Sequence, residues 1–130
     1  TDYSMQQEFL YRHFKTIKRA VESGVFKFLA HIDYARKLGD GIYVPENYLP
    51  EQLEILDVLQ KQNRPMEIST KGLRKIGDFY PCKTILAAAA ERNIKFVISD
   101  DAHAVSELGD RFDLAEARLS RFGIKNRLKF

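Results

Sequence analysis

Three short apolar runs divide this sequence, and segments with helical periodicity separate them. The runs cover residues 25–30, 65–69 and 95–99, a length typical of buried strands. Before the first run, apolar residues recur at helical spacing: Phe9, Leu10, Phe14, Ile17 and Val21. Strands that alternate with helices favour a parallel sheet with right-handed crossovers. The sequence therefore predicts an α/β fold.

Capping and breaking residues predict where the elements begin and end. We expect helices from Ser4 to Gly24, from Pro50 to Gln62, from Pro81 to about Asn93, and over residues 113–122 with Gly123 as the stop. We also expect a short helix over residues 34–38, a loop over 40–49, a polar loop over 70–80 and a short final strand within 124–130.

Composition limits the class of protein. Hydrophobic residues make up 45% and charged residues 30%, a balance typical of a globular domain. No apolar run approaches the ~20 residues of a membrane span. Thr1 to Ser4 have no basic start and no apolar stretch after it, so we expect no signal peptide. Cys82 is the only cysteine, and one thiol cannot form an internal disulfide, which suits a cytoplasmic location. We interpret Cys82 as structural. The net charge of +3 comes from interspersed charges, so nucleic-acid binding is not indicated.

Polar residues follow the apolar runs, where the carboxyl ends of parallel strands would share one edge of the sheet. Asp101 and His103 come directly after the third run, and His31 ends the first. Carboxylate oxygen and imidazole nitrogen are ligands for Zn, Mn or Fe, so these three residues are candidate metal ligands. The alternatives are a capping or loop role for Asp101 and His103, and a hydrogen-bonded structural role for His31. Asp33 can either orient a ligand or cap the short helix that follows.

The segment after the second run is basic and contains a glycine. Lys71 and Arg74 are candidate phosphate-binding residues, because guanidinium binds phosphate through a planar fork and ammonium as a point charge. The alternative is an ordinary solvated basic loop.

Taken together, these segments resemble the PHP (polymerase and histidinol phosphatase) superfamily, and the histidinol-phosphate phosphatases within it. Residues 28–33 resemble its Gly-His-x-Asp strand end, and residues 67–75 resemble its Glu-Ile-Asn-Thr-x-Gly-Leu-Arg-Lys segment. Tyr80-Pro81 resembles a Tyr-Pro that opens the next helix, and residues 97–103 resemble its Gly-Ser-Asp-Ala-His signature. Order and spacing agree from about Tyr11 to Gly123.

The resemblance implies that residues 1–130 are the C-terminal portion of a PHP-type metallophosphatase domain, part of a distorted (β/α)7 barrel resembling a TIM barrel. It implies hydrolysis of a small phosphorylated substrate, L-histidinol phosphate, to L-histidinol in histidine biosynthesis. His31, Asp101 and His103 would bind divalent metal ions, and Arg74 and Lys71 would bind the substrate phosphate. Asp101 or His103 would also move a proton, which makes them the candidate catalytic residues.

The sequence also departs from the family. The N-terminal His-x-His motif is absent, as are the histidine and glutamate that follow it in the family. Asp100 replaces a serine, Ser99 a glycine and Ser69 an asparagine. We therefore expect a fragment or processed chain whose remaining barrel half, or a second copy, covers the exposed core. The alternative functions are a non-catalytic PHP-like domain and a PHP-type phosphodiesterase or nuclease.

Overall fold

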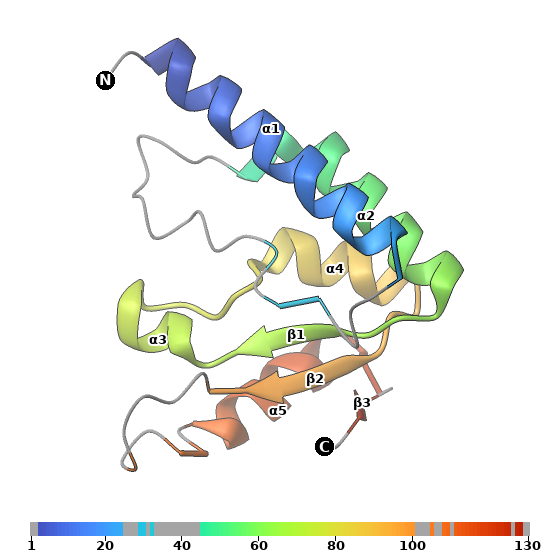
Figure 1. Ribbon diagram of the computed structural model, residues 1–130. Helices are drawn as coiled ribbons and strands as arrows, with labels where there is room; N and C mark the ends of the chain where they lie inside the picture. The colour runs from blue at the N-terminus through green and yellow to red at the C-terminus, as the bar shows by residue number, and fades with distance from the viewer. Residues whose placement is uncertain are drawn as a thin grey trace.

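The computed structural model describes residues 3–24, 29–30, 32, 45–100, 105, 108–109, 111–125 and 127–128. Its elements are, in chain order, α1 (Tyr3–Glu22), the short 3-10 helix η2 (Pro45–Tyr48), α2 (Leu49–Gln62), β1 (Met66–Ser69), α3 (Lys71–Lys75), α4 (Lys83–Glu91), β2 (Phe96–Ser99), α5 (Phe112–Arg121) and β3 (Arg127–Leu128). Figure 1 shows the strands with the helices packed around them.

The three strands form a parallel sheet in the order β1-β2-β3. β1 and β2 are paired from Met66 with Phe96 to Ser69 with Ser99. Leu29 lies on the other side of β1, where its amide donates to Pro65 O (3.0 Å) and its carbonyl accepts from the Glu67 amide (2.8 Å). The segment that contains Leu29 therefore extends the sheet, in agreement with a strand before His31, although residues 25–28 lie outside the described part of the chain.

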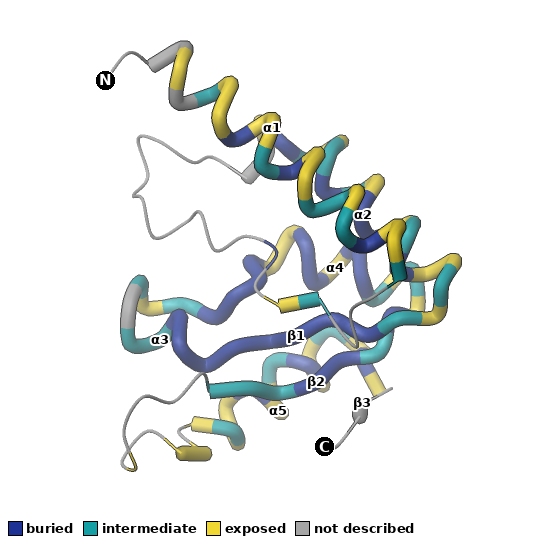
Figure 2. The backbone as a smooth tube through the Cα atoms, in the orientation of Figure 1, coloured by how far each residue is buried: buried dark blue, intermediate teal, exposed yellow. Residues whose placement is uncertain are grey.

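One hydrophobic core joins the sheet to the helices. α1 packs along α2, α2 contacts α4, and α5 packs on β2. Figure 2 shows β1 buried along its whole length, between these layers. The core residues that are fully buried come from every layer: Leu10, Phe14, Ile55, Leu56, Met66, Ile68, Ile85, Leu86, Ala89, Phe96, Ala115 and Leu119.

The structure confirms most of the predicted elements and corrects two. The loop expected over residues 40–49 is wrong in its described part, where residues 45–48 form the 3-10 helix η2 and α2 begins at Leu49. Four predicted helices correspond to α1, α2, α4 and α5, and β1, β2 and β3 lie within the predicted strands. The predicted polar loop over residues 70–80 is wrong in its first half, which forms the one-turn helix α3. A helix of five residues is too short to show apolar periodicity, and contacts with the rest of the fold hold it. The short helix expected over residues 34–38 lies outside the described part of the chain.

Two smaller observations concern the boundaries. α4 begins at Lys83, two residues later than predicted, because Cys82 is extended (φ −70°, ψ 167°) and precedes the first turn. Cys82 is buried, as expected for a structural cysteine.

Among the described helices, none has both the length and the hydropathy needed to span a bilayer.

Phe14 should be a main anchor of α1, because its ring is fully buried and lies 5.6 Å from the Tyr48 ring, centroid to centroid. We expect Phe14→Ala to lower the free energy of unfolding by about 3–5 kcal/mol, through lost burial and a residual cavity. Phe9→Ala is the matched control on the same helix. Phe9 is 64% exposed, so its truncation should change stability by less than about 0.5 kcal/mol. Urea unfolding followed by circular dichroism measures both, and equal losses would contradict the packing of α1.

Candidate functional site

The candidate site lies at the carboxyl edge of the sheet, where β1 and β2 end together. Ser69 and Ser99 form the last pair of the register, and Figure 1 shows the arrowheads of both strands pointing the same way. The chain therefore leaves both strands at one edge, as the sequence predicts for these two runs.

Hydrogen bonds fix the chain where it passes from β1 into α3. The Thr70 amide donates to Ser99 O (2.9 Å), and the Thr70 hydroxyl donates to the same oxygen (3.4 Å). The Ser69 hydroxyl accepts a hydrogen bond from the Lys71 amide (3.2 Å). Thr70 and Ser69 are fully buried, so these polar groups are satisfied within the fold and hold the start of α3 against the end of β2.

Gly72 allows α3 to pack against the segment that follows it. A β-carbon at this position would lie 2.0 Å from the Asp78 carbonyl oxygen. The Asp78 backbone cannot move away easily, because the Arg118 side chain binds the Asp78 carboxylate (3.1 Å) and its guanidinium lies 4.8 Å from the centroid of the Phe79 ring. The glycine in the 67–75 segment therefore has a packing reason: only a residue without a side chain fits.

Arg74 connects α3 to the end of β2. Its Nη2 donates to the Asp100 carbonyl oxygen (2.6 Å). The Asp100 carboxylate in turn accepts a hydrogen bond from the Gly109 amide through Oδ2 (2.6 Å). A guanidinium has five N–H donors, so Arg74 can keep this contact and still bind an anion. The sequence identifies Asp100 only as a residue that replaces a serine of the family motif. Its hydrogen bond to Gly109 had no sequence signal.

Lys71 lies at the same edge and is 9% exposed. This burial contradicts the alternative of a solvated basic loop at this position. Glu67, two residues before the end of β1, is likewise buried, with 5% exposure. Charged residues are rarely buried outside ion pairs and binding sites, so the carboxyl end of β1 is an unusually polar part of the interior.

The predicted metal ligands His31, Asp101 and His103 lie outside the described residues, as does Asp33. Within the residues that the structure describes, no three His, Cys, Asp or Glu side chains are grouped to hold a metal ion. The donor types of the predicted set, two imidazoles and one carboxylate, suit Zn, Mn or Fe by their chemistry. The metal site stays a prediction.

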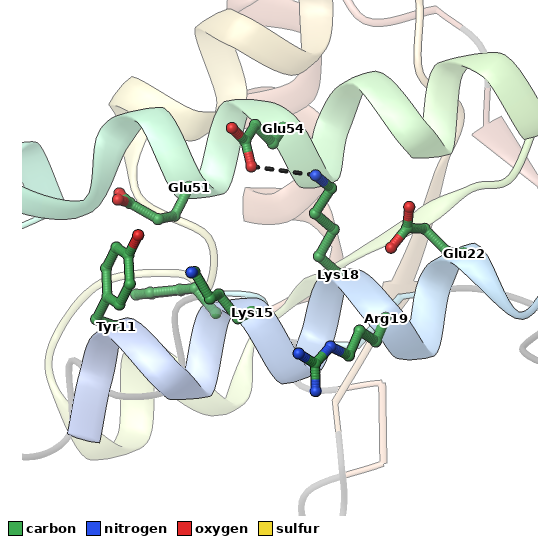
Figure 3. Close-up of a pocket in the computed structure, with 8 residues that line it drawn as sticks. Tyr11, Lys15, Lys18, Arg19, Glu22, Glu51 and Glu54 are labelled. Carbon is green, nitrogen blue, oxygen red and sulfur yellow. Dashed lines mark hydrogen bonds and ion pairs between the residues drawn. The ribbon is translucent and has the colours of Figure 1, made fainter. Parts of the chain in front are cut away.

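A groove of about 340 Å³ lies elsewhere, between α1 and α2. Figure 3 shows Lys18 of α1 reaching across it to Glu54 of α2, and their Nζ and Oε2 atoms are 3.2 Å apart. The Lys18 and Glu54 side chains are 35% and 59% exposed, so this ion pair adds little stability. The groove is lined by cations of α1, carboxylates of both helices and the aromatic residues Tyr11 and Phe14, and it lies away from the strand ends. We interpret it as a solvated seam between two helices.

Comparison with known proteins relates the chain to one family. No protein-family model matches the sequence. A Deinococcus radiodurans protein named "Probable histidinol-phosphatase" is 36% identical over 109 residues, a region that covers 79% of this chain and 39% of that protein. A crystal structure titled "putative histidinol phosphatase hisK from Listeria monocytogenes" matches with a TM-score of 0.69 and 26% identity, over 78% of this chain and 41% of that chain. This chain is a relative of the histidinol-phosphatases.

The resemblance found in the sequence motifs is thereby confirmed. The chain spans about two fifths of the length of these histidinol-phosphatase relatives. Both the sequence and the fold of the chain that contains Gly72 and Arg74 therefore resemble the histidinol-phosphatases.

Gly72→Ala should destabilise this histidinol-phosphatase relative, because the new methyl group would overlap the Asp78 carbonyl oxygen. We expect a loss of about 3 kcal/mol or more, since the overlap involves backbone that cannot rotate away. Gly123→Ala is the control. Gly123 has a φ of +74°, and a β-carbon added there would meet nothing within 4 Å, so only the left-handed conformation should cost energy, about 1–2 kcal/mol. Urea midpoints compare the two variants. A smaller loss for Gly72→Ala than for Gly123→Ala would contradict the close approach.

Proposed function

We propose that this chain forms part of a metal-dependent phosphatase that hydrolyses the phosphate monoester of L-histidinol phosphate. The observation that carries the proposal is the 36% identity, over 79% of the chain, with a protein named as a histidinol-phosphatase. The structural similarity at a TM-score of 0.69 supports the same family independently. In this proposal, residues 1–130 are a C-terminal portion of a distorted (β/α)7 barrel, in agreement with the parallel strands β1, β2 and β3.

The described residues would contribute a binding site for the phosphate. A phosphate monoester is a dianion, and Arg74 can offer it a planar fork of donors while Lys71 offers a point charge. Because Lys71 is almost fully buried, its charge would act in a medium of lower polarity than water and attract the phosphate more strongly. The hydrogen bond from Arg74 to Asp100 O would fix the guanidinium before the substrate arrives and reduce the entropy lost on binding.

His31, Asp101 and His103 would hold the divalent metal ions that the family resemblance implies. A bound Zn, Mn or Fe ion would supply Lewis-acid charge and lower the pKa of water. Asp101 or His103 would accept the proton of the attacking water or donate one to the leaving alcohol. The Arg74 guanidinium would offset the negative charge that develops on the phosphoryl oxygens.

Release of inorganic phosphate from L-histidinol phosphate tests the proposal. The chain is assayed with Zn²⁺, Mn²⁺ or Fe²⁺, alone and with the part of the Deinococcus relative that it does not match. We expect hydrolysis of the monoester and none of the diester bis(p-nitrophenyl) phosphate. Hydrolysis of the diester alone would instead indicate a phosphodiesterase. If the chain bound L-histidinol phosphate but hydrolysed it in none of these assays, it would be a non-catalytic domain.

Arg74→Ala should weaken the apparent affinity for L-histidinol phosphate on the order of 10- to 100-fold, since a hydrogen bond to a charged group contributes about 1.5–3 kcal/mol. Arg74→Lys should recover part of the lost affinity, because lysine keeps the positive charge but lacks the planar guanidinium that binds phosphate with two donors. Arg121→Ala, on the exposed last turn of α5, removes the same charge at a distance from the edge and should change nothing. Isothermal titration calorimetry measures the affinities. If Arg74→Ala lowered only the melting temperature, Arg74 would be a structural link to Asp100 and not a substrate ligand.

A further inference from the structure

α1 carries an apolar surface that is wider than the part covered by the rest of the structure. At 3.6 residues per turn, the apolar and weakly polar positions of α1 span about 180° of the helix circumference. The buried residues Leu10, Phe14 and Val21, together with the partly buried Ile17 that packs against the core, occupy only about 60° of it. Met5 and Phe9 lie on the remaining part, 63% and 64% exposed. The apolar surface of a helix in a globular protein is normally about as wide as the area that packs against its neighbour. The apolar surface of α1 is wider than the area covered by the described elements, which indicates a second neighbour.

The remaining part forms a continuous stripe of the exposed Met5 and Phe9 and the half-buried His13, which we name the α1 stripe. These residues are four apart, so they stand above one another on the helix. The Phe9 and His13 rings are stacked, with centroids 6.3 Å apart and planes inclined by 8°. His13 also contacts the Phe14 ring at 5.5 Å, and burial lowers the pKa of the imidazole below 6.5. The stripe therefore begins where the covered face of α1 ends.

We propose that the α1 stripe is the docking site of an amphipathic helix from the part of the fold that the relatives possess and this chain does not span. The chain corresponds to 39% and 41% of the two relatives, so most of their structure must be placed around the elements described above. In a layer of helices that surrounds a parallel sheet, each helix has a neighbour on both sides. α1 has α2 along one side, and the stripe faces the other.

The charges beside the stripe indicate the chemistry of this partner helix. Arg12 and Arg19 flank the stripe on the side opposite to the buried face. Figure 3 shows the Arg19 guanidinium pointing away from α2 and Glu54. Arg12 is paired with Glu8 on the surface (2.7 Å), with both side chains largely exposed. A complementary helix would place its apolar residues on Met5 and Phe9 and acidic residues opposite Arg19.

The same charges argue against a second copy of this chain as the occupant. Two antiparallel α1 stripes related by a two-fold axis would place Arg12 of both copies on the same side of the interface, where like charges repel. Three side chains also cover far less than the ~1,200–2,000 Å² that a stable complex of two folded proteins buries. A helix that belongs to the same fold needs no such area from the stripe alone, because other contacts would hold it.

A binding experiment with a defined polypeptide tests this inference without substrate or metal, so its result does not depend on the proposed phosphatase activity. The probe is the part of the Deinococcus relative that this chain does not match. We expect the double variant Met5→Ser/Phe9→Ser to bind the probe on the order of 100-fold more weakly than the native chain, since two apolar side chains lose their burial. Leu114→Ser is the matched control on α5, where Leu114 is 49% exposed. It should bind like the native chain.

Charge reversal gives a second, independent readout. Arg19→Glu should weaken binding and Arg121→Glu should not, although both change the net charge equally. Equal affinities for the stripe variant and Leu114→Ser, or no binding by the native chain, would overturn the proposal. A homodimer detected by analytical ultracentrifugation that Met5→Ser/Phe9→Ser dissociates would also overturn it, because the occupant would then be a second copy.

Discussion

The pairing of Ser69 with Ser99 determines how the rest of the carboxyl edge is built. It sets β1 and β2 to end at the same level, so that the Thr70 amide and hydroxyl both reach Ser99 O. α3 begins directly from this anchor. A shift of one residue in the register would turn the buried side chains of β1 to the opposite face, and it would also separate Thr70 from its acceptor. Core packing and site geometry therefore depend on one alignment.

Two further contacts convert this anchor into a rigid segment. Gly72 lets the α3 backbone meet the Asp78 carbonyl, and Arg74 reaches the Asp100 carbonyl on the neighbouring strand end. Lys71 precedes both residues and is buried. The basic residues of this segment are thus held by backbone contacts on both sides. Such pre-organisation is what a site for a charged ligand requires, because the cost of ordering the side chains has been met before binding.

The sequence predicts the long elements well and the site only in part. The periodicity of α1, the proline in the first turn of α2 and the apolar runs of β1 and β2 are local signals, and the structure agrees with them. α3 has no such signal, because tertiary contacts at Thr70 and Gly72 hold its single turn. The burial of Lys71 and the hydrogen bond of Asp100 to Gly109 depend on segments distant in sequence. The motif resemblance predicted a phosphate-binding role for the 67–75 segment, and that role stays a prediction, while the predicted ligands His31, Asp101 and His103 lie outside the described residues.

The position of Lys71 and Arg74 also bears on what this chain could do without the rest of the fold. Cations that bind a phosphate monoester stabilise the bound substrate and the product phosphate as well as the transition state, so by themselves they increase affinity more than rate. Rate acceleration would require groups that act on water and on the leaving alcohol, which the family resemblance assigns to the metal ligands. The edge of β1 and β2 would then supply recognition and charge compensation. Because the proposed recognition would rely on the register of two strands and on one short helix, it would need fewer parts of the fold than hydrolysis, which would depend on every ligand being present.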